Sequence, residues 1–298
     1  MSLNDFEKIQ IIENKGKSSI FKVKRKKDSL FYILKNIKFQ NLEKNDKESA
    51  INEIKVLSTL KHPNIIELKE AFFDKPSHSL NLVFEFPNNG NLKNKIKFAI
   101  KNNMHMKESI IWNVLTQILH GLNYLHKKGI IHRNLISKNI FLTKNRLVKI
   151  TDFTACCILE NNKKALTQVG TPFYTAPEIW NEEPYNYKCD IWSLGCIIYE
   201  MASLSLPFSG NSVELLYKDI MAKKMKPLPD FYSENLKNII NNMLTFDPSK
   251  RPTADILLKY PNIKKITNKF NSIYDKYLIG QGINYSNKKT YKKKKNFS

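Results

Sequence analysis

Apolar side chains recur every three or four positions between residues 108 and 127, which is the spacing of one face of a helix. The apolar positions of that helix are Ile111, Leu115, Ile118, Leu119, Leu122 and Leu125. A second helix is predicted over residues 44–60, with Ile51, Ile54, Leu57 and Leu60 on its apolar face. Apolar and polar residues alternate over residues 6–38, which predicts strands. Further helical patterns follow at 188–204, 212–223, 233–244 and 253–258.

Six short motifs occur in one order along these elements. They are Tyr32-Ile33-Leu34-Lys35, His132-Arg133-Asn134, Asp152-Phe153-Thr154, Ala176-Pro177-Glu178, Asp190-Ile191-Trp192-Ser193-Leu194-Gly195 and Asp247-Pro248-Ser249-Lys250-Arg251-Pro252. They resemble the V-A-I-K, H-R-D, D-F-G, A-P-E, D-x-W-S-x-G and D-P-x-x-R-P signatures of protein kinases. Since the order and spacing agree as well, coincidence is negligible.

The resemblance covers residues 5–260, and within the family the chain is most similar to the NIMA-related serine/threonine kinases. That similarity rests on residues 62–66 (H-P-N-I-I) and on the run from Gly170 to Glu178. The resemblance implies an α+β, bilobal fold. A small β-rich N-lobe would span about residues 1–86 and a larger helical C-lobe about 87–262. Together they would form a kinase-like domain of residues 1–262, followed by a basic tail of residues 263–298.

Two substitutions fall on positions that carry the chemistry of the family. Asn134 stands where kinases have the aspartate that accepts the proton of the substrate hydroxyl. An amide has nearly the same shape as a carboxylate, but it is not a base at neutral pH. Ile136 replaces the lysine that contacts the transferring phosphate, so a positive charge is missing where negative charge must be stabilised.

Other polar positions of the nucleotide site are retained. Lys35 matches the lysine that holds the α- and β-phosphates of ATP, and Glu53 matches the glutamate that pairs with it. Asn139 and Asp152 match the two Mg²⁺ ligands. The resemblance also assigns Ile20, Ile33 and Glu85 to the ATP pocket.

Several features oppose nucleotide binding. The phosphate-covering pattern G-x-G-x-x-G-x-V aligns with Glu13, Lys15, Ser18 and Ile20, so no glycine keeps its position. Glycine lets the backbone approach the phosphates closely, and Glu13 adds a negative charge near an anionic ligand. In the hinge, which falls near residues 84–91, Pro87 lacks the N–H that would bind adenine. Binding of ATP and Mg²⁺ is therefore expected to be weak or absent.

Structural and regulatory positions are better preserved. The resemblance predicts a buried ion pair between Glu178 and Arg251, and it predicts that Asp190 holds the backbone of the catalytic loop. Thr167 lies where many kinases carry a phosphothreonine, and Arg133 matches the arginine that pairs with that phosphate. An ordinary exposed threonine is the competing interpretation of Thr167. Leu57, Leu68, His132 and Phe153 match four side chains that stack between the lobes of active kinases.

Composition adds a strong positive charge. The net charge is +22 over 298 residues, and nearly all the cations are lysine, with arginine only at positions 25, 133, 146 and 251. An A/T-rich genome would explain this bias. The dense block at residues 288–295 also resembles a nuclear-localisation or nucleic-acid-binding patch.

The N-terminus lacks the pattern of a signal peptide, and the cysteine spacing implies neither zinc nor disulfides. The expected location is cytoplasmic, with a nuclear location as the second expectation.

Two functions remain open at this point. The first is a pseudokinase, a scaffold or allosteric partner of another protein such as an active kinase. The second is a weakly active, ATP-dependent serine/threonine kinase that relies on Lys35, Glu53, Asn139 and Asp152. The altered catalytic positions favour the first. No membrane span is expected, and contact of the tail with an acidic protein or nucleic acid is a third, minor hypothesis.

Overall fold

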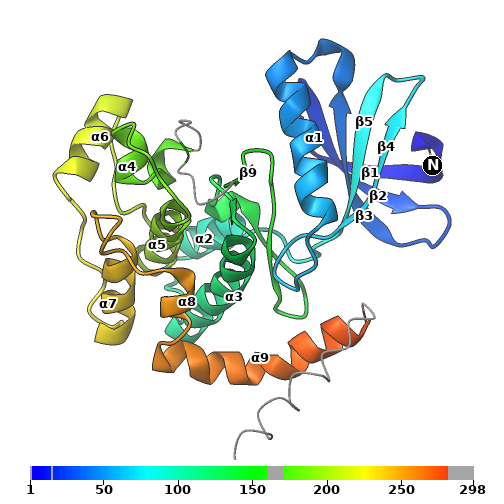
Figure 1. Cartoon of the computed structure of the whole chain (residues 1–298). Coiled ribbons are helices and arrows are strands. Elements are labelled where there is room, and N and C mark those ends of the chain that lie inside the picture. The colour runs from blue at the N-terminus through cyan, green and yellow to red at the C-terminus, as the bar shows by residue number, and fades with distance from the viewer. Residues whose placement is uncertain (1, 15, 160–164, 166–170, 281–298) are drawn as a thin grey trace, which may run out of the picture.

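The computed structural model describes residues 2–14, 16–159, 165 and 171–280, and it forms two lobes (Figure 1). The smaller N-terminal lobe contains a five-stranded sheet and one long helix, whereas the larger lobe is mostly helical. The predicted α+β, bilobal fold is confirmed. No helix within these ranges combines the length and the apolar character needed to cross a membrane.

The N-lobe sheet is antiparallel, and its strand order is β1-β2-β3-β5-β4. Its strands are β1 (Phe6–Asn14), β2 (Ser18–Arg25), β3 (Phe31–Lys38), β4 (Leu68–Asp74) and β5 (Ser79–Glu85). Val23, Leu34 and Val83 come from three neighbouring strands and are fully buried together. The β-branched and leucine side chains of these strands thus supply a small core of their own, which keeps the sheet rigid above the cleft.

Helix α1 (Lys44–Ser58) connects this sheet to the rest of the molecule. The predicted apolar face was wrong at Ile51, whose side chain is 42% exposed. The buried positions are Ala50, Glu53, Val56 and Leu57. A helix turns by about 100° per residue, so Ile51 and Glu53 point to opposite sides. Burial of the Glu53 carboxylate therefore sets which face turns inward.

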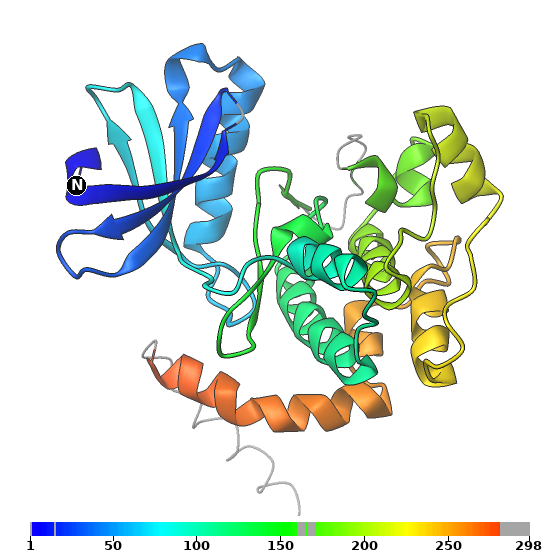
Figure 2. The same ribbon diagram turned by 180° about the vertical axis from the view of Figure 1, so that it is seen from behind.

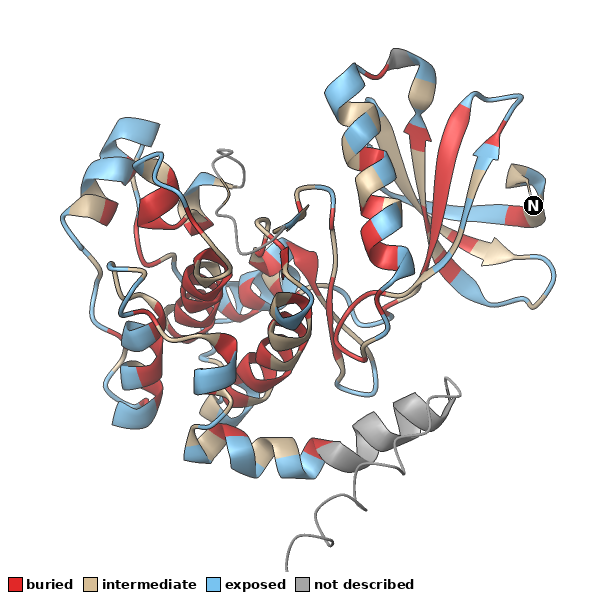
Figure 3. Ribbon diagram, in the orientation of Figure 1, coloured by how far each residue is buried: buried red, intermediate tan, exposed pale blue. Residues whose placement is uncertain are grey.

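The C-lobe is organised around two long helices, α3 (Glu108–Lys127) and α5 (Lys188–Ser203). Figure 3 shows both as the most continuously buried helices of the molecule. The other C-lobe helices are α2 (Leu92–Lys101), α4 (Pro177–Trp180), α6 (Val213–Met221), α7 (Glu234–Met243) and α8 (Ala254–Leu257). The apolar pattern identified neither α2 nor the single-turn α4. The other C-lobe helices named here, α3, α5, α6, α7 and α8, lie within a few residues of their predicted positions.

Short elements between α3 and α4 position the functional residues. Two small antiparallel sheets pair β6 (Ile130–Ile131) with β9 (Cys157–Ile158) and β7 (Ile140–Leu142) with β8 (Val148–Ile150). The 3-10 helices η3 (Ser137–Asn139) and η4 (Pro172–Tyr174) lie in the same region, whereas η1 (Leu3–Asp5) and η2 (Phe39–Asn41) belong to the N-lobe. Because these strands and 3-10 helices are only two or three residues long, they contain few backbone hydrogen bonds. Hydrogen bonds of side chains therefore fix the geometry of the loops between them.

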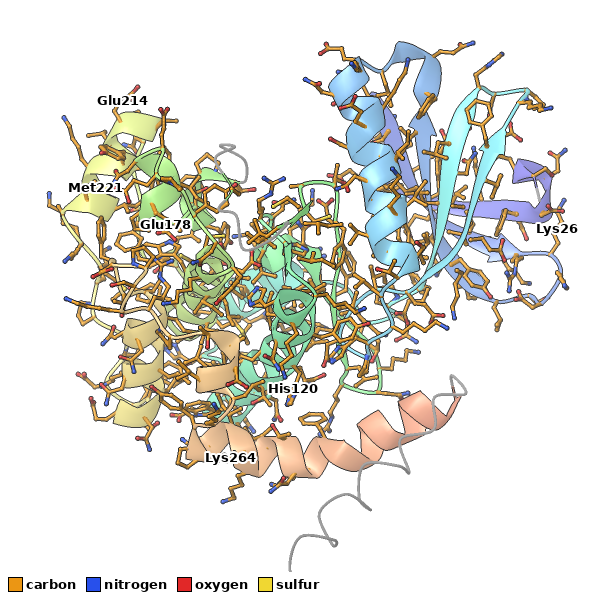
Figure 4. The ribbon with its side chains drawn as sticks, in the orientation of Figure 1. Lys26, His120, Glu178, Glu214, Met221 and Lys264 are labelled. Atoms are coloured by element: carbon orange, nitrogen blue, oxygen red, sulfur yellow. The ribbon has the colours of Figure 1, made fainter. Side chains whose placement is uncertain are left out.

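The predicted ion pair between Glu178 and Arg251 is present in the C-lobe core. Arg251 Nη1 and Nη2 donate to the two carboxylate oxygens of Glu178, at 2.7 and 2.9 Å. Both side chains are almost completely buried. Arg251 also donates to the carbonyl oxygens of Thr245, Lys188 and Phe246. This bidentate pair fastens α4, labelled by Glu178 in Figure 4, to the end of the domain.

A further helix, α9 (Pro261–Gly280), was not predicted. It contacts α3, and in Figures 1 and 2 it passes beneath the C-lobe at an angle to that helix. Ile263 is fully buried, and His120 of α3 lies 3.0 Å from the Thr267 hydroxyl. Figure 4 labels His120 beside this helix. The boundary expected between domain and tail, at residues 262 and 263, falls inside α9. The lysine block at residues 288–295 lies outside the described residues.

Candidate functional site

A buried ion pair joins the N-lobe sheet to α1. Lys35 on β3 donates to the Glu53 carboxylate over 2.7 Å, and the Glu53 side chain is 2% exposed. Burial alone would lower the pKa of Lys35, but the charges of Glu53, Asp152 and Glu13 raise it above its usual value. The lysine is therefore a fixed cation at the back of the interlobe cleft, as its motif predicts.

The loop that follows β6 is held by one buried carboxylate. Asp190 of α5 accepts the backbone N–H groups of His132 and Arg133, at 3.0 and 2.9 Å. His126 of α3 also contacts Asp190, at 2.9 Å. Burial opposes ionisation of Asp190, yet the contacts with His126 and His132 hold its pKa below the usual value. The predicted role of Asp190 is confirmed.

Two residues of this region adopt left-handed backbone conformations that side chains rarely favour. Arg133 has φ of +62° and Asp152 has φ of +63°. Neither is glycine or asparagine, so each conformation costs free energy, of order 1–3 kcal/mol. The Asp190 bonds hold the first, and the network around Asp152 holds the second. Such strain places the Asp152 carboxylate where it faces Asn134 and Lys35.

Asn134 and Asp152 form the centre of the site. The Asn134 amide Nδ2 donates to Asp152 Oδ2 over 3.0 Å. Asn139 donates to the carbonyl oxygen of Asn134 over 3.0 Å, and its amide lies 3.4 Å from the same Asp152 oxygen. Burial would raise the pKa of Asp152, but the charge of Lys35 and the Thr154 hydroxyl hold it below its ordinary value. A carboxylate therefore sits ionised among donors, and the amide at position 134 is one of them.

Thr154 takes a part that sequence reasoning missed. Its hydroxyl donates to Asp152 Oδ1 over 2.8 Å and accepts from Lys35 Nζ over 3.0 Å. It also lies 3.3 Å from the Glu53 carboxylate. The signal was the threonine in Asp152-Phe153-Thr154, which the sequence marked only as a departure from glycine. In the folded chain this hydroxyl links the Lys35–Glu53 pair to Asp152.

Comparison with known proteins identifies the family to which a site of this geometry belongs. A protein kinase domain model matches residues 6–263. The chain belongs to the protein kinase family. It is 37% identical over 275 residues to the probable serine/threonine-protein kinase nek2 of Dictyostelium discoideum, covering 90% of this chain and 66% of that protein.

Two other relatives support the NIMA-related assignment. The chain is 37% identical over 243 residues to the serine/threonine-protein kinase Nek4 of Mus musculus, covering 81% of this chain and 30% of the relative. It is 33% identical over 294 residues to the G2-specific protein kinase nimA of Emericella nidulans, covering 89% and 42%. The chain thus spans less than half the length of these two relatives, and 66% of the Dictyostelium protein.

Two of the four residues that the sequence predicts to stack between the lobes contact each other directly. The His132 and Phe153 rings meet edge to face, with centroids 4.9 Å apart, and both are fully buried. Leu57 is buried in the same cluster, and Leu68 packs against it. Leu57, Leu68 and Phe153 therefore belong to the main core or pack against it, and His132 meets that core through the Phe153 ring. A continuous stack of all four side chains between the lobes stays a prediction.

Ile136 lies beside Asn134 on the wall of a small cleft in the C-lobe. The remaining residues of that wall are Arg133, Leu135, Thr171, Tyr174, Thr175, Ile179, Cys189 and Ser193. Ile136 itself is half-buried and packs against the main core. The side chain that replaces the kinase lysine thus contributes apolar contact at this wall, where the kinase pattern has a cation.

The residues assigned to the adenine side come together at the sheet. Ile33 of β3 lies opposite Phe84 of β5, and Ile20 of β2 lies opposite Lys35. Glu85 has a second role that its motif did not show. Its carboxylate pairs with the buried Lys149 ammonium of β8, at 2.6 Å. The Glu85 side chain therefore braces the hinge against the C-lobe.

Arg133 is occupied within the described residues. Its side chain donates to the carbonyl oxygens of Ala155 and Cys156, at 2.6 and 3.4 Å, and to the Tyr185 hydroxyl at 3.3 Å. Thr167, its expected phosphorylated partner, lies outside the described residues. Pairing between the two stays a prediction. The guanidinium is nevertheless directed at the segment that follows Asp152, which is where that pairing requires it.

Proposed function

We propose that this kinase homologue transfers phosphate poorly or not at all, and that it acts as a scaffold or allosteric partner of another protein, such as an active kinase. The observation that carries the proposal is the hydrogen bond from Asn134 Nδ2 to Asp152. A group that donates its N–H to a carboxylate cannot accept the proton of a substrate hydroxyl at the same place. The kinase position for the general base is thus held by a donor.

The cation beside that position is also replaced. Ile136 supplies no charge, and phosphoryl transfer depends mainly on positioning and electrostatic stabilisation. General acid–base groups alone contribute roughly 10²–10⁴-fold to rates. The two losses act on the same transition state, and together they support a large deficit.

Nucleotide would be held by the retained groups. Lys35 and Glu53 are paired as kinases require, and the oxygen atoms of Asp152 and Asn139 are ligands of the kind Mg²⁺ prefers. Bound Mg²⁺–ATP would supply the transferable phosphoryl group. Both Asp152 oxygens already accept hydrogen bonds, from Asn134 and Thr154, which disfavours a metal at this carboxylate. We therefore propose weak binding of ATP and Mg²⁺.

A second candidate function is a weakly active serine/threonine kinase of the NIMA-related type. The intact Lys35–Glu53 pair and the buried His132–Phe153 contact favour it, because both accompany an active-like arrangement of α1. The relatives named above carry kinase activity in their names. Residual activity would then depend on positioning alone.

One assay separates the two candidates. The chain is incubated with radiolabelled ATP, Mg²⁺ and casein or myelin basic protein, beside an Asp152→Ala variant. The proposal expects equal incorporation in both samples. Incorporation by the unaltered chain clearly above that of Asp152→Ala would establish the weak kinase and end the pseudokinase proposal.

We also propose an acidic binding partner for this chain and a role for its lysine block in contact or location. The strongly positive composition favours an acidic partner surface. The lysine block at residues 288–295 is proposed to make that contact or to direct the chain to the nucleus. Deletion of residues 286–298 should weaken salt-sensitive binding to an acidic partner, or shift a fluorescent fusion toward the cytoplasm. If neither changes, the lysines reflect composition only.

A further inference from the structure

An ion pair crosses the mouth of the interlobe cleft. The Lys138 ammonium of η3, in the catalytic loop, donates to the Glu13 carboxylate near the end of β1. The two residues are 125 positions apart in the chain. The Glu13 side chain is 24% exposed and that of Lys138 is 52% exposed. The contact therefore joins the N-lobe to the C-lobe at the edge of the cleft.

The strand register directs Glu13 toward the phosphate side of the site. Glu13 of β1 lies opposite Ile20 of β2, and Ile20 lies opposite Lys35 of β3. Residues directly opposite one another on neighbouring strands share a face of the sheet. Two strand spacings, of about 4.8 Å each, separate the Glu13 and Lys35 backbones. The carboxylate and the buried lysine thus face the same cleft.

The electrostatics agree with this placement. Burial works against the charge on Lys35, and the carboxylates of Glu53, Asp152 and Glu13 together raise its pKa. Glu13 is thus an anion that interacts with two lysines, one on each lobe. It stands where the kinase pattern has the first glycine of the phosphate-covering loop. A nucleotide polyphosphate would bring several more negative charges to these same cations.

We propose that Glu13 is a specificity-determining residue, an internal anion that shares Lys138 and Lys35 and selects adenosine or its monophosphate over the triphosphate. Its pairing with Lys138 holds the end of β1 across the catalytic loop. The inference rests on the proposed function only in placing an adenine nucleoside or nucleotide in this cleft. It does not depend on whether phosphate is transferred.

The test compares four ligands on one variant. Glu13→Gln keeps the shape of the side chain and removes its charge. Calorimetric titration with adenosine, AMP, ADP and ATP, in buffer containing EDTA, measures the charge effect without a metal ion. We expect ATP to bind about tenfold more tightly to Glu13→Gln than to the unaltered chain, as removal of one nearby like charge predicts. The gain should fall from ATP to AMP, and adenosine affinity should change less than about twofold.

Asp255→Asn is the matched control. Asp255 pairs with Lys259 at 2.7 Å on the surface of the C-lobe, with side chains 52% and 64% exposed. This variant also removes one exposed carboxylate and frees one lysine, but neither residue belongs to the phosphate-covering segment and no contact between the lobes is broken. We expect its affinities for all four ligands to equal those of the unaltered chain. An equal gain in ATP affinity in Asp255→Asn would overturn the proposal, because net charge alone would then explain it.

Lys138→Gln tests the contact itself. With its partner removed, Glu13 keeps its charge, so ATP affinity should fall rather than rise. Hydrogen exchange at residues 10–14 and 16–20 should be faster in both Glu13→Gln and Lys138→Gln, and the double variant should add nothing further. This hydrogen-exchange measurement needs no nucleotide. Unchanged exchange in the rest of the chain also shows that each variant is folded.

The outcomes are separable from those of the proposed function. Detectable phosphotransfer would refute the pseudokinase proposal and leave the ATP-to-adenosine affinity ratio as a valid test. An unchanged ratio in Glu13→Gln, or failure of that variant to bind ATP at all, would overturn the role of Glu13. Exchange rates that are additive in the double variant would overturn the contact between the lobes.

Discussion

The framework behind the catalytic loop keeps the polar residues of the kinase pattern, whereas the side of the cleft that faces phosphate has lost several of them. Behind the loop, Asp190 holds two backbone N–H groups, and Arg251 pairs with Glu178. On the phosphate side, Asn134 and Ile136 replace a proton-accepting carboxylate and a cation of the kinase pattern. The fold thus requires the first set of groups, and only catalysis requires the second.

The physical reason lies in burial. Removing one partner of a buried ion pair leaves a charge without compensation, at a cost of about 3–5 kcal/mol. Replacing a carboxylate by an amide at the cleft costs little if the amide finds an acceptor, as Asn134 does at Asp152. A kinase fold can therefore change these cleft positions at little cost in stability, and the following variants test that separation.

Arg251→Met should give the largest effect. It leaves the Glu178 carboxylate buried without its guanidinium, and the free energy of unfolding should fall by about 3–5 kcal/mol in urea denaturation. Lys259→Met is the control, because Lys259 pairs with Asp255 on the surface, with side chains 64% and 52% exposed. Its effect should stay below about 1 kcal/mol. Equal effects would mean that burial does not distinguish the framework.

Asp190→Asn should cost about 1–3 kcal/mol, since an amide offers one acceptor oxygen to a site that uses two. Hydrogen exchange at the His132 and Arg133 amides should accelerate, which a purely global loss of stability would not confine to that loop. Asp255→Asn serves as the exposed control. Unchanged protection at both amides would show that Asp190 does not hold the loop.

His62→Gln should flatten the pH dependence of stability. Burial, with the charges of His120 and Lys149, lowers the pKa of His62 to about 3. The unfolded chain binds a proton near pH 6.5, and the folded chain does not. Stability from this group is complete above pH 6.5 and is lost as the pH falls toward 3. By pH 5 the loss reaches about 2 kcal/mol.

The measurement is urea denaturation at pH 7 and pH 5, in the unaltered chain and in two variants. His62→Gln should lose less stability between those values. His105→Gln, at an exposed position, should keep the full slope. A slope that is steeper or unchanged in His62→Gln would contradict the assignment.

Asn134→Asp should have the smallest effect. It replaces the amide donor by a second carboxylate next to Asp152, so one of the two pKa values must rise. A stability loss of about 1 kcal/mol at pH 7 is expected, with phosphotransfer rising less than about tenfold because Ile136 and Glu13 remain. A return to ordinary kinase rates from this single change would show that the phosphate side tolerates its other substitutions.

The framework was readable from the sequence, and the details of the cleft were not. Asp190, Glu178 and Arg251 stand in motifs whose order fixes their roles. The contacts of Thr154 with Lys35 and Asp152 depend on how closely two lobes approach, which no local pattern records. The same holds for the pair formed by Glu13 and Lys138.

Two predictions from apolar periodicity failed for physical reasons: helix α9 was missed, and the inner face of α1 was wrong at Ile51. Helix α9 carries Ile263, Ile266, Phe270 and Ile273 at helical spacing, and Ile263 and Phe270 are buried in the folded chain. The many lysine and asparagine residues around them led the sequence interpretation to treat this segment as a polar tail. In α1, a buried carboxylate at Glu53 turned Ile51 outward. Apolar periodicity assumes that apolar side chains alone choose the inner face, and a buried ion pair breaks that assumption.

Single-turnover phosphotransfer in three chains tests the separation of framework and chemistry most directly. The chains are the unaltered protein, Asp152→Ala, and the double variant Asn134→Asp with Ile136→Lys, each given radiolabelled ATP, Mg²⁺ and casein. The account predicts no difference between the first two and clear incorporation by the third, because the framework that positions the loop is intact. Incorporation by the unaltered protein above Asp152→Ala, or none by the double variant, would contradict it.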